Sequence, residues 1–157
     1  MKIREATKKD FRQLIKLIQL ADGRTKAWAI KKTKKYLKKN YLLILVAVED
    51  GKIVGYVFLD ECDDDERIAR KLNIKKFSSV AHIAVHPDYR HRKIGSKLLS
   101  SCEKPSREWK KNGIFLDCRS DRILFYEKNK YKNIGYFIRK ENVKRPRRQY
   151  VMFRRFR

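Results

Sequence analysis

The sequence predicts one α+β (mixed α/β) domain with a central twisted mixed sheet of about six to seven strands, flanked by about four helices. Three observations support this prediction. First, 157 residues can enclose one hydrophobic core but not two of ordinary size. Second, 42% of the residues are hydrophobic and 11% are aromatic, which is enough apolar material for that core. Third, helical and strand-like apolar patterns follow one another in the order β-α-α-β-β-β-α-β-α-β-β.

The N-terminal part predicts one strand and two helices. Residues 2–6 have the pattern of a short strand, and Thr7 is placed to cap the helix that follows. Apolar residues at positions 11, 14, 15 and 18 share one helix face, and Asp22-Gly23 ends that helix. A second helix is expected over residues 25–39. Its outer face is strongly basic, because residues 24–39 contain eight Lys or Arg and no acid.

The middle of the chain predicts a β-hairpin. Residues 41–49 and 52–60 are rich in β-branched and aromatic side chains. Asp50-Gly51 between them suits a tight turn in which both central residues have positive φ. An acidic stretch over residues 60–66 follows, and we expect it to be a solvated loop or the start of a helix.

The second half predicts a helical crossover between parallel strands and a closing hairpin. A strand ends at His86-Pro87, because proline cannot continue the ladder, and a helix begins at Gly95 and is interrupted by Pro105. A strand, a helix and a further strand in this order form a parallel pair. The expected elements are strands 80–85 and 114–118, helices 95–102 and 121–130, and a hairpin of residues 134–138 with 149–153.

The formal net charge of +24 limits the partners that the chain can attract. Lys and Arg number 42 against 18 Asp and Glu, which favours nucleic acid, acidic proteins or phosphorylated cofactors. A lysine-rich surface without a dedicated partner is the alternative. The three cysteines are too far apart for a metal pair or a disulfide framework. The sequence has no apolar signal core and no membrane-spanning run, so we expect a cytoplasmic protein without a membrane partner.

Residues 80–99 carry the clearest chemical signal of the sequence. A buried strand and a proline stop lead into a basic loop with Arg90, Arg92 and Lys93, and then into a helix start. The first N–H groups of a helix have no intrahelical partner, and the helix dipole is positive there. Gly95 permits close approach of the backbone. The pattern suits a pyrophosphate, and an ordinary crossover with a solvated loop is the alternative.

The same segment resembles the acyl-CoA-binding motif of the GNAT acyltransferase superfamily. That motif is Arg or Gln, two variable residues, Gly, one variable residue and Gly or Ala, after a strand that ends in Val-x-Pro. Residues 90–95 match it, except that Lys93 stands at the first glycine. Segments 3–18, 46–56 and 125–136 are similar to the first strand and helix, the hairpin and the Tyr-Glu-Lys-x-Gly-Phe segment of the family. The resemblance is closest to the bacterial ribosomal-protein N-terminal acetyltransferases, and it implies a single GNAT-like domain over residues 1–157.

The resemblance implies direct transfer of an acetyl group from acetyl-CoA to an amine, without a metal. The strand backbone is expected to pair with the pantetheine arm, and the loop and helix start are expected to hold the pyrophosphate. The corresponding cofactor-binding residues are Ile83, Ala84, Val85, Arg90, His91, Arg92, Lys93, Ile94, Gly95 and Ser96.

The resemblance also suggests catalytic residues. The reaction needs a base that keeps the amine neutral and an acid that protonates the leaving thiolate. Tyr126 stands where many family members place the acid, and a tyrosine packed in the core is the alternative. Asp117 stands near the place of the base in the ribosomal-protein branch, and an exposed carboxylate at a strand end is the alternative. Glu49 and His82 are weaker candidates for the base.

Family members bind the acceptor between the first two helices and the last hairpin. Both borders are basic here, since residues 139–157 add nine Lys or Arg and one Glu to the basic second helix. A positive groove favours a protein N-terminus or a lysine in an acidic context as the acceptor. The competing hypothesis is a GNAT-like module that binds nucleic acid or ribosomes with little or no catalysis, with Tyr150, Phe153 and Phe156 stacking on bases. Nonspecific nucleic-acid contact through the basic surface is compatible with either hypothesis.

Overall fold

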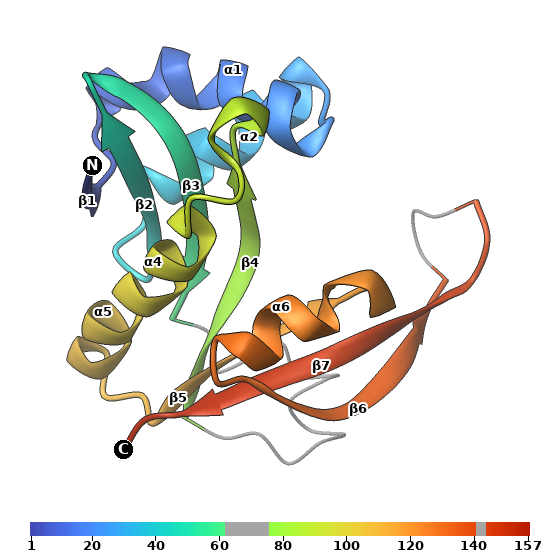
Figure 1. Ribbon diagram of the computed structural model, residues 1–157. Coiled ribbons are helices and arrows are strands. Elements are labelled where there is room, and N and C mark those ends of the chain that lie inside the picture. The colour runs from blue at the N-terminus through green and yellow to red at the C-terminus, as the bar shows by residue number, and fades with distance from the viewer. Residues whose placement is uncertain (62–75, 141–143) are drawn as a thin grey trace.

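The structure is a computed structural model that describes residues 1–61, 76–140 and 144–157 (Figure 1). These residues form a seven-stranded mixed sheet in the order β1-β2-β3-β4-β5-β7-β6. The predicted mixed α/β class and the predicted number of strands are therefore confirmed. Most of the predicted acidic stretch, residues 62–66, lies outside the described residues. No helix within the described ranges is both long and apolar enough to span a membrane.

The first three strands form an antiparallel meander. β1 (Lys2–Glu5) pairs with β2 (Leu42–Glu49), and β2 pairs with β3 (Lys52–Asp60). At the turn between β2 and β3, Asp50 has a φ of 49° and Gly51 has a φ of 74°. A tight hairpin turn needs positive φ at both positions, so the predicted hairpin is confirmed.

A helical crossover joins the parallel pair of strands. β4 (Phe77–Val85) is antiparallel to β3 and parallel to β5 (Gly113–Cys118). α4 (Ile94–Ser101) and α5 (Glu103–Glu108) connect the two strands, as predicted. Pro105 lies in the first turn of α5, where a missing backbone N–H is tolerated. The predicted interruption is therefore a short break between two helices.

The chain closes with a long β-hairpin. α6 (Ile123–Lys128) precedes β6 (Lys132–Arg139), which pairs with β7 (Arg147–Arg155). β7 also pairs with β5, so the last strand of the sequence lies inside the sheet and β6 forms its edge. Figure 1 shows this hairpin extending away from the rest of the molecule.

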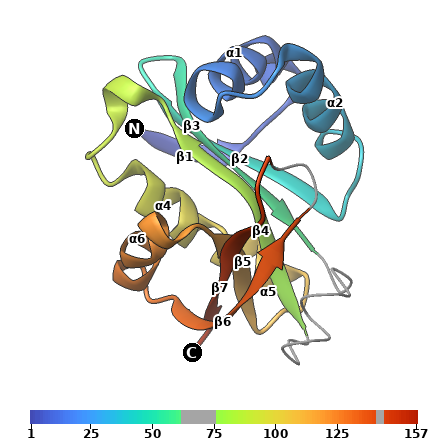
Figure 2. The same ribbon diagram turned by 90° about the vertical axis from the view of Figure 1, so that its right-hand side faces the viewer.

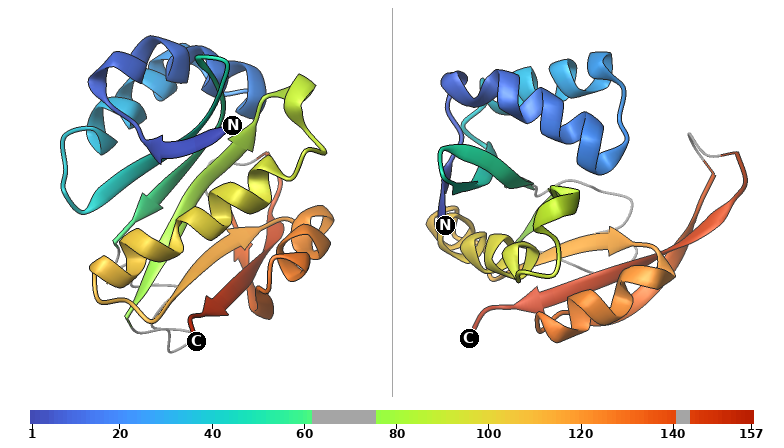
Figure 3. Two further views of the ribbon diagram at one scale, coloured as in Figure 1. Left: turned by 60° about the vertical axis from the view of Figure 1, so that its left-hand side comes forward. Right: turned by 45° about the horizontal axis from the view of Figure 1, so that its top comes forward.

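Helices cover both faces of the sheet (Figures 2 and 3). α1 (Phe11–Asp22) and α2 (Lys26–Tyr36) pack on one face, and α4, α5 and α6 lie on the other. Phe58 of β3 is fully buried beneath α1 and α2, while the next residue, Leu59, is fully buried on the α4 face. Each face therefore has its own core, as the alternation of side chains along a strand requires. Three single-turn 3-10 helices, η1 (Lys8–Asp10), η2 (Pro87–Tyr89) and η3 (Ser120–Arg122), precede α1, α4 and α6.

β4 and β5 separate after a short contact. Their ladder begins at Phe77 and Gly113 and ends where Ser79 faces Phe115. Beyond that point β4 keeps its β3 partner and β5 keeps its β7 partner. Figures 1 and 3 show the two strands diverging. The C-terminal half of β4 therefore presents an open backbone edge on the side of β5.

Candidate active site

A β-bulge sets the directions of the side chains on the open half of β4. Leu59 faces Val80 and Phe58 faces His82, so Ala81 is an extra residue in β4. After the bulge, His82 and Ala84 lie on the face of α1 and α2. Two of the predicted cofactor-binding residues, Ile83 and Val85, pack instead on the α4 face, and Ala84 lies between them.

The loop between β4 and α4 passes twice through the left-handed backbone region. His91 has a φ of 62° and Lys93 has a φ of 59°. Lys93 precedes the first turn of α4, so the N–H groups of Ile94, Gly95 and Ser96 have no intrahelical partners. The position of the expected first glycine therefore takes a conformation that favours glycine, and Lys93 adopts it at a cost of about 1 kcal/mol.

Two arginines of this loop bind the protein itself. Nε of Arg90 donates to the carbonyl of Val85 at 3.3 Å, and its Nη2 donates to the carbonyl of Ala21 at 3.4 Å. Arg90 thereby positions the loop against the ends of β4 and α1. Arg92 lies 3.7 Å from the carboxylate of Glu49. Glu49, a weaker candidate for the base, therefore lies beside the basic loop.

Gly95 allows α4 and α6 to approach closely. A Cβ at this position would lie 3.1 Å from Cζ of Phe125 and 3.9 Å from Cγ2 of Val85. The first distance is shorter than an ordinary van der Waals contact. The sequence predicted a close backbone approach at Gly95, and the neighbour that approaches is the Phe125 ring of α6.

The predicted acid, Tyr126, lies on the α4 and α6 side of the sheet. Its side chain belongs to the same buried cluster as Cys118 at the end of β5, where β4 and β5 have already separated. Burial, together with the neighbouring Cys118 and Asp117, raises the pKa of Tyr126 well above its ordinary value. The phenol therefore stays protonated at neutral pH and can donate a proton.

The predicted base, Asp117, lies on the opposite face of the sheet. Cys118 and Leu116 point toward α4 and α6, so the alternation of β5 turns Asp117 toward the face of α1 and α2. Nη2 of Arg139 donates to Oδ2 of Asp117 at 3.2 Å. Tyr126 and Asp117 therefore flank the open end of the sheet from two sides, and an arginine binds the carboxylate.

His82 lies on the same face as Asp117, in a mainly aromatic environment. Its ring centroid is 4.9 Å from that of Trp28 and 6.0 Å from that of Phe58, and both contacts are edge-to-face. Its Nδ1 is 3.8 Å from Oδ2 of Asp22 at the end of α1. Within the described ranges, no three His, Cys, Asp or Glu side chains gather as metal ligands.

Three cations surround His82. Burial, together with Lys32, Arg24 and Arg139, lowers the pKa of His82 to about 3. Lys32 places Nζ 5.9 Å from the ring centroid of Trp28, and the guanidinium of Arg24 lies 4.8 Å from the same ring. We name Arg24, Lys32 and Arg139 the cationic cluster. Burial lowers the pKa of Lys32 as well, against the opposite effect of Asp60.

The sequence analysis described a basic helix but missed this cluster. One signal was available, because Trp28 and Lys32 are four residues apart and so share one helix face, and Arg24 directly precedes the N-cap residue of that helix. No local signal linked them to Arg139 or His82. The three segments meet only through packing of α2 and β6 near β4.

The splayed sheet, the basic loop and the free start of α4 are the features expected of a protein that uses an extended, phosphorylated co-substrate. Several solved structures have a similar fold. A ribosomal-protein-alanine N-acetyltransferase from Brucella melitensis has a TM-score of 0.77 at 17% identity, with 99% of this chain and 100% of that chain covered. An aminoglycoside 6'-N-acetyltransferase from Enterococcus faecium has a TM-score of 0.75 at 16% identity, with 99% and 97% covered. Another aminoglycoside 6'-N-acetyltransferase, complexed with coenzyme A, has a TM-score of 0.73 at 17% identity, with 99% and 97% covered.

At the sequence level, residues 40–133 match the family described as Acetyltransferase (GNAT) domain. The chain therefore belongs to the GNAT acetyltransferase family. No curated protein sequence matches this chain. Membership of this family confirms the predicted enzyme class and acetyl-CoA as the co-substrate. The similar structures include acetyltransferases for ribosomal proteins and for aminoglycosides, so they do not fix the acceptor.

Proposed function

We propose that the protein acetylates an amine acceptor that carries acidic groups, namely a protein N-terminus or a lysine in an acidic context. The observation that carries this proposal is the cationic cluster around His82 together with the basic segments 24–39 and 139–157 that contain it, which leave a surplus of positive charge although Asp22 pairs with Arg24 and Asp117 pairs with Arg139. Its positive charge attracts carboxylates that flank the acceptor amine. The same charge repels polyamines and aminoglycosides, which carry several ammonium groups.

The open half of β4 and the start of α4 fit acetyl-CoA. The pantetheine arm carries amides that match the open backbone edge of residues 83–85. The free N–H groups of residues 94–96 suit the pyrophosphate. The exposed side chains of His91, Arg92 and Lys93 add positive charge there. When bound, acetyl-CoA supplies the activated thioester.

Tyr126 is the proposed proton donor to the leaving thiolate, because its phenol is protonated at neutral pH and lies in the same cluster as Cys118, where β4 and β5 have separated. On the acceptor side, the cationic cluster disfavours a bound ammonium and so favours the neutral amine that attacks the thioester. This effect reduces the demand on a base. The carboxylate of Asp117, the base that the resemblance suggests, binds Arg139.

The test compares acceptors and two matched pairs of variants. We expect a higher kcat/KM for peptides with acidic residues after the N-terminus than for neutral peptides or spermidine. Lys32→Met removes one cation of the cluster and should lower the preference for acidic over neutral peptides about tenfold. Lys31→Met, an exposed neighbour on α2, should leave it unchanged. Faster turnover of spermidine than of acidic peptides would overturn the proposed acceptor.

Tyr126→Phe tests the proton donor. It should lower kcat about a hundredfold without changing the affinity for acetyl-CoA, measured by calorimetry in high salt. Tyr131→Phe is the control, since Tyr131 is also buried beside Tyr126 and its hydroxyl has no hydrogen-bond partner among the described residues. Full turnover by Tyr126→Phe would assign the acid to another group.

A further inference from the structure

The edge strand β6 exposes apolar side chains. Ile134 is 37% exposed, Tyr136 is 47% exposed and Ile138 is 45% exposed. Leu124 of the adjacent α6 is 71% exposed. An edge strand with this composition is a site for association unless charge or a partner covers it.

An arginine lies against the most exposed aromatic ring of this strand. Tyr136 faces Tyr150 across the β6–β7 ladder and Ile138 faces Arg148, so these four side chains share one face of the hairpin. The Arg148 guanidinium lies 4.6 Å from the centroid of the Tyr136 ring. We name Tyr136, Ile138 and Arg148 the Tyr136 patch.

The charge around the patch determines which occupant fits. Residues 128–157 contain twelve Lys or Arg and one Glu. A second copy of this chain would bring the same surplus to the contact, and like charges would oppose the association. A polyanion complements the surface, and a polyanion with flat aromatic groups also complements an exposed tyrosine beside an arginine.

We propose that the Tyr136 patch binds single-stranded nucleic acid, with a base stacked on Tyr136 and phosphates bound by Arg148 and its basic neighbours. Stacked bases cover the exposed apolar side chains, and the phosphates neutralise the positive charge of the hairpin. The hairpin extends away from the body of the molecule (Figures 1 and 3), and Tyr136 and Ile138 are 47% and 45% exposed on it. This inference does not depend on the proposed acceptor.

The stacking residues predicted from the sequence were different ones, and the structure leaves them less exposed than Tyr136. Tyr150, Phe153 and Phe156 are half-buried and pack against the cores. The Phe153 ring lies 4.8 Å from that of Phe77, and the Arg107 guanidinium lies 4.8 Å from the Phe156 ring. The Tyr136 side chain is more exposed than these three, and the Arg148 guanidinium lies against its ring.

The test measures binding of fluorescently labelled oligouridine by anisotropy, without acetyl-CoA, at an ionic strength of about 0.15 M. Tyr136→Ala should weaken binding about tenfold, because loss of one stacked base costs roughly that factor. Tyr136→Phe should bind as the unmodified protein does. Tyr41→Ala is the control, since Tyr41 is 45% exposed but lies next to β2. Arg148→Gln should reduce the slope of log affinity against log salt by about 0.7.

Heparin separates stacking from charge, because it is a polyanion without bases. The unmodified protein and Tyr136→Ala should bind heparin equally. Unchanged oligouridine binding by Tyr136→Ala, or an equal loss for oligouridine and heparin, would overturn the proposal. Either result would leave the acetyl transfer untouched, since that reaction is measured separately with peptide acceptors.

Discussion

Lys93 precedes α4 as its N-cap residue and lies in the left-handed backbone region, with a φ of 59° and a ψ of 15°. In this region the Cβ of any residue other than glycine is crowded by a carbonyl oxygen. His91, two residues earlier, has a φ of 62°. Together the two residues store about 2 kcal/mol of strain, and strain of this kind persists where the surrounding structure holds a ligand site in place.

Lys93→Gly should relieve part of this strain. We expect the free energy of unfolding, measured in urea, to rise by about 1 kcal/mol. Lys97→Gly is the matched control, since Lys97 is exposed within the same helix. This substitution should lower the free energy of unfolding by about 1 kcal/mol. Equal destabilisation by both changes would contradict the argument.

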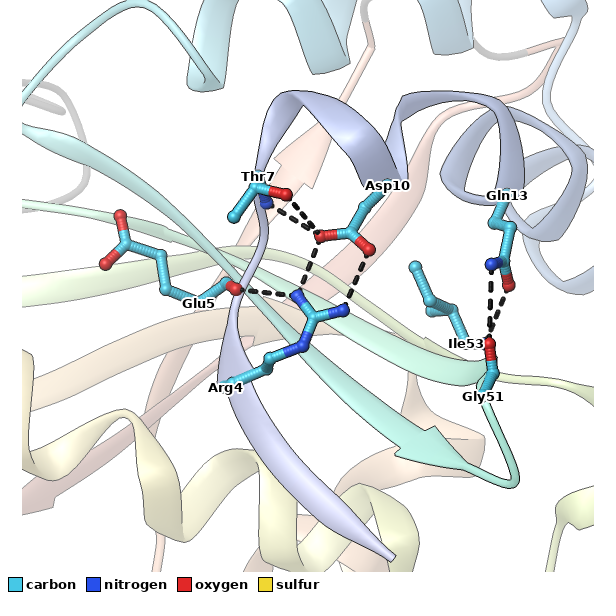
Figure 4. A network of polar contacts seen from close by, with 7 residues as sticks. All are labelled: Arg4, Glu5, Thr7, Asp10, Gln13, Gly51 and Ile53. Carbon is cyan, nitrogen blue, oxygen red and sulfur yellow. Dashed lines mark hydrogen bonds and ion pairs between the residues drawn. The ribbon is translucent and has the colours of Figure 1, made fainter.

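A polar network joins β1 to the start of α1 (Figure 4). Arg4 donates to both carboxylate oxygens of Asp10, at 2.7 and 2.9 Å, and the N–H of Thr7 donates to Asp10 at 2.7 Å. Gln13 of α1 accepts a hydrogen bond from the N–H of Ile53 at 3.0 Å. The short edge strand and the first helix are thereby held to the sheet by buried and half-buried polar contacts.

Asp10→Asn should weaken this connection in a pH-dependent way. The hydrogen bond from Arg4 lowers the pKa of Asp10 to about 2. A carboxylate with a lowered pKa stabilises the fold above its ordinary pKa near 4, and this stabilisation is lost as the pH falls toward 2. We expect a loss of about 2 kcal/mol at pH 7, measured in urea, that disappears near pH 2.

The control for this prediction is Asp88→Asn, because the Asp88 side chain is 84% exposed. It should change the free energy of unfolding little at either pH. A deficit of Asp10→Asn that is the same at both pH values would mean that packing, and not the ion pair, accounts for the loss.

The positive charge of the whole molecule opposes its compact state. With a net charge of +24, the folded chain brings like charges closer together than the unfolded chain does. Salt screens this repulsion, since the Debye length falls from about 30 Å at 0.01 M to about 8 Å at 0.15 M.

The melting temperature should therefore rise between these two ionic strengths. Combining Lys34→Glu with Lys38→Glu lowers the net charge at two exposed positions and should weaken the salt dependence. The measurement is thermal unfolding followed by circular dichroism. A melting temperature that falls with added salt would show that attractive ion pairs outweigh the repulsion.

Much of the fold followed from short patterns. Asp50-Gly51 predicted the β2–β3 turn, and Pro87 predicted the end of β4. The basic loop and the helix after it predicted the crossover between parallel strands. These signals act within a few residues, because they concern backbone angles, missing donors and helical spacing.

The surroundings of the candidate site followed no such pattern. The cations around His82 come from segments far apart in the chain, and so does the contact of Arg139 with Asp117. The exposure of Tyr136 likewise depends on which elements pack beside β6. Burial and electrostatic potential at a site depend on neighbours in space, and those neighbours are set by how α2, β4 and β6 pack. The order of residues was therefore sufficient for the family, the fold and the basic loop. The tertiary structure was needed to find the positive charge on the acceptor side and the exposed tyrosine, because both depend on neighbours in space that are distant in the sequence.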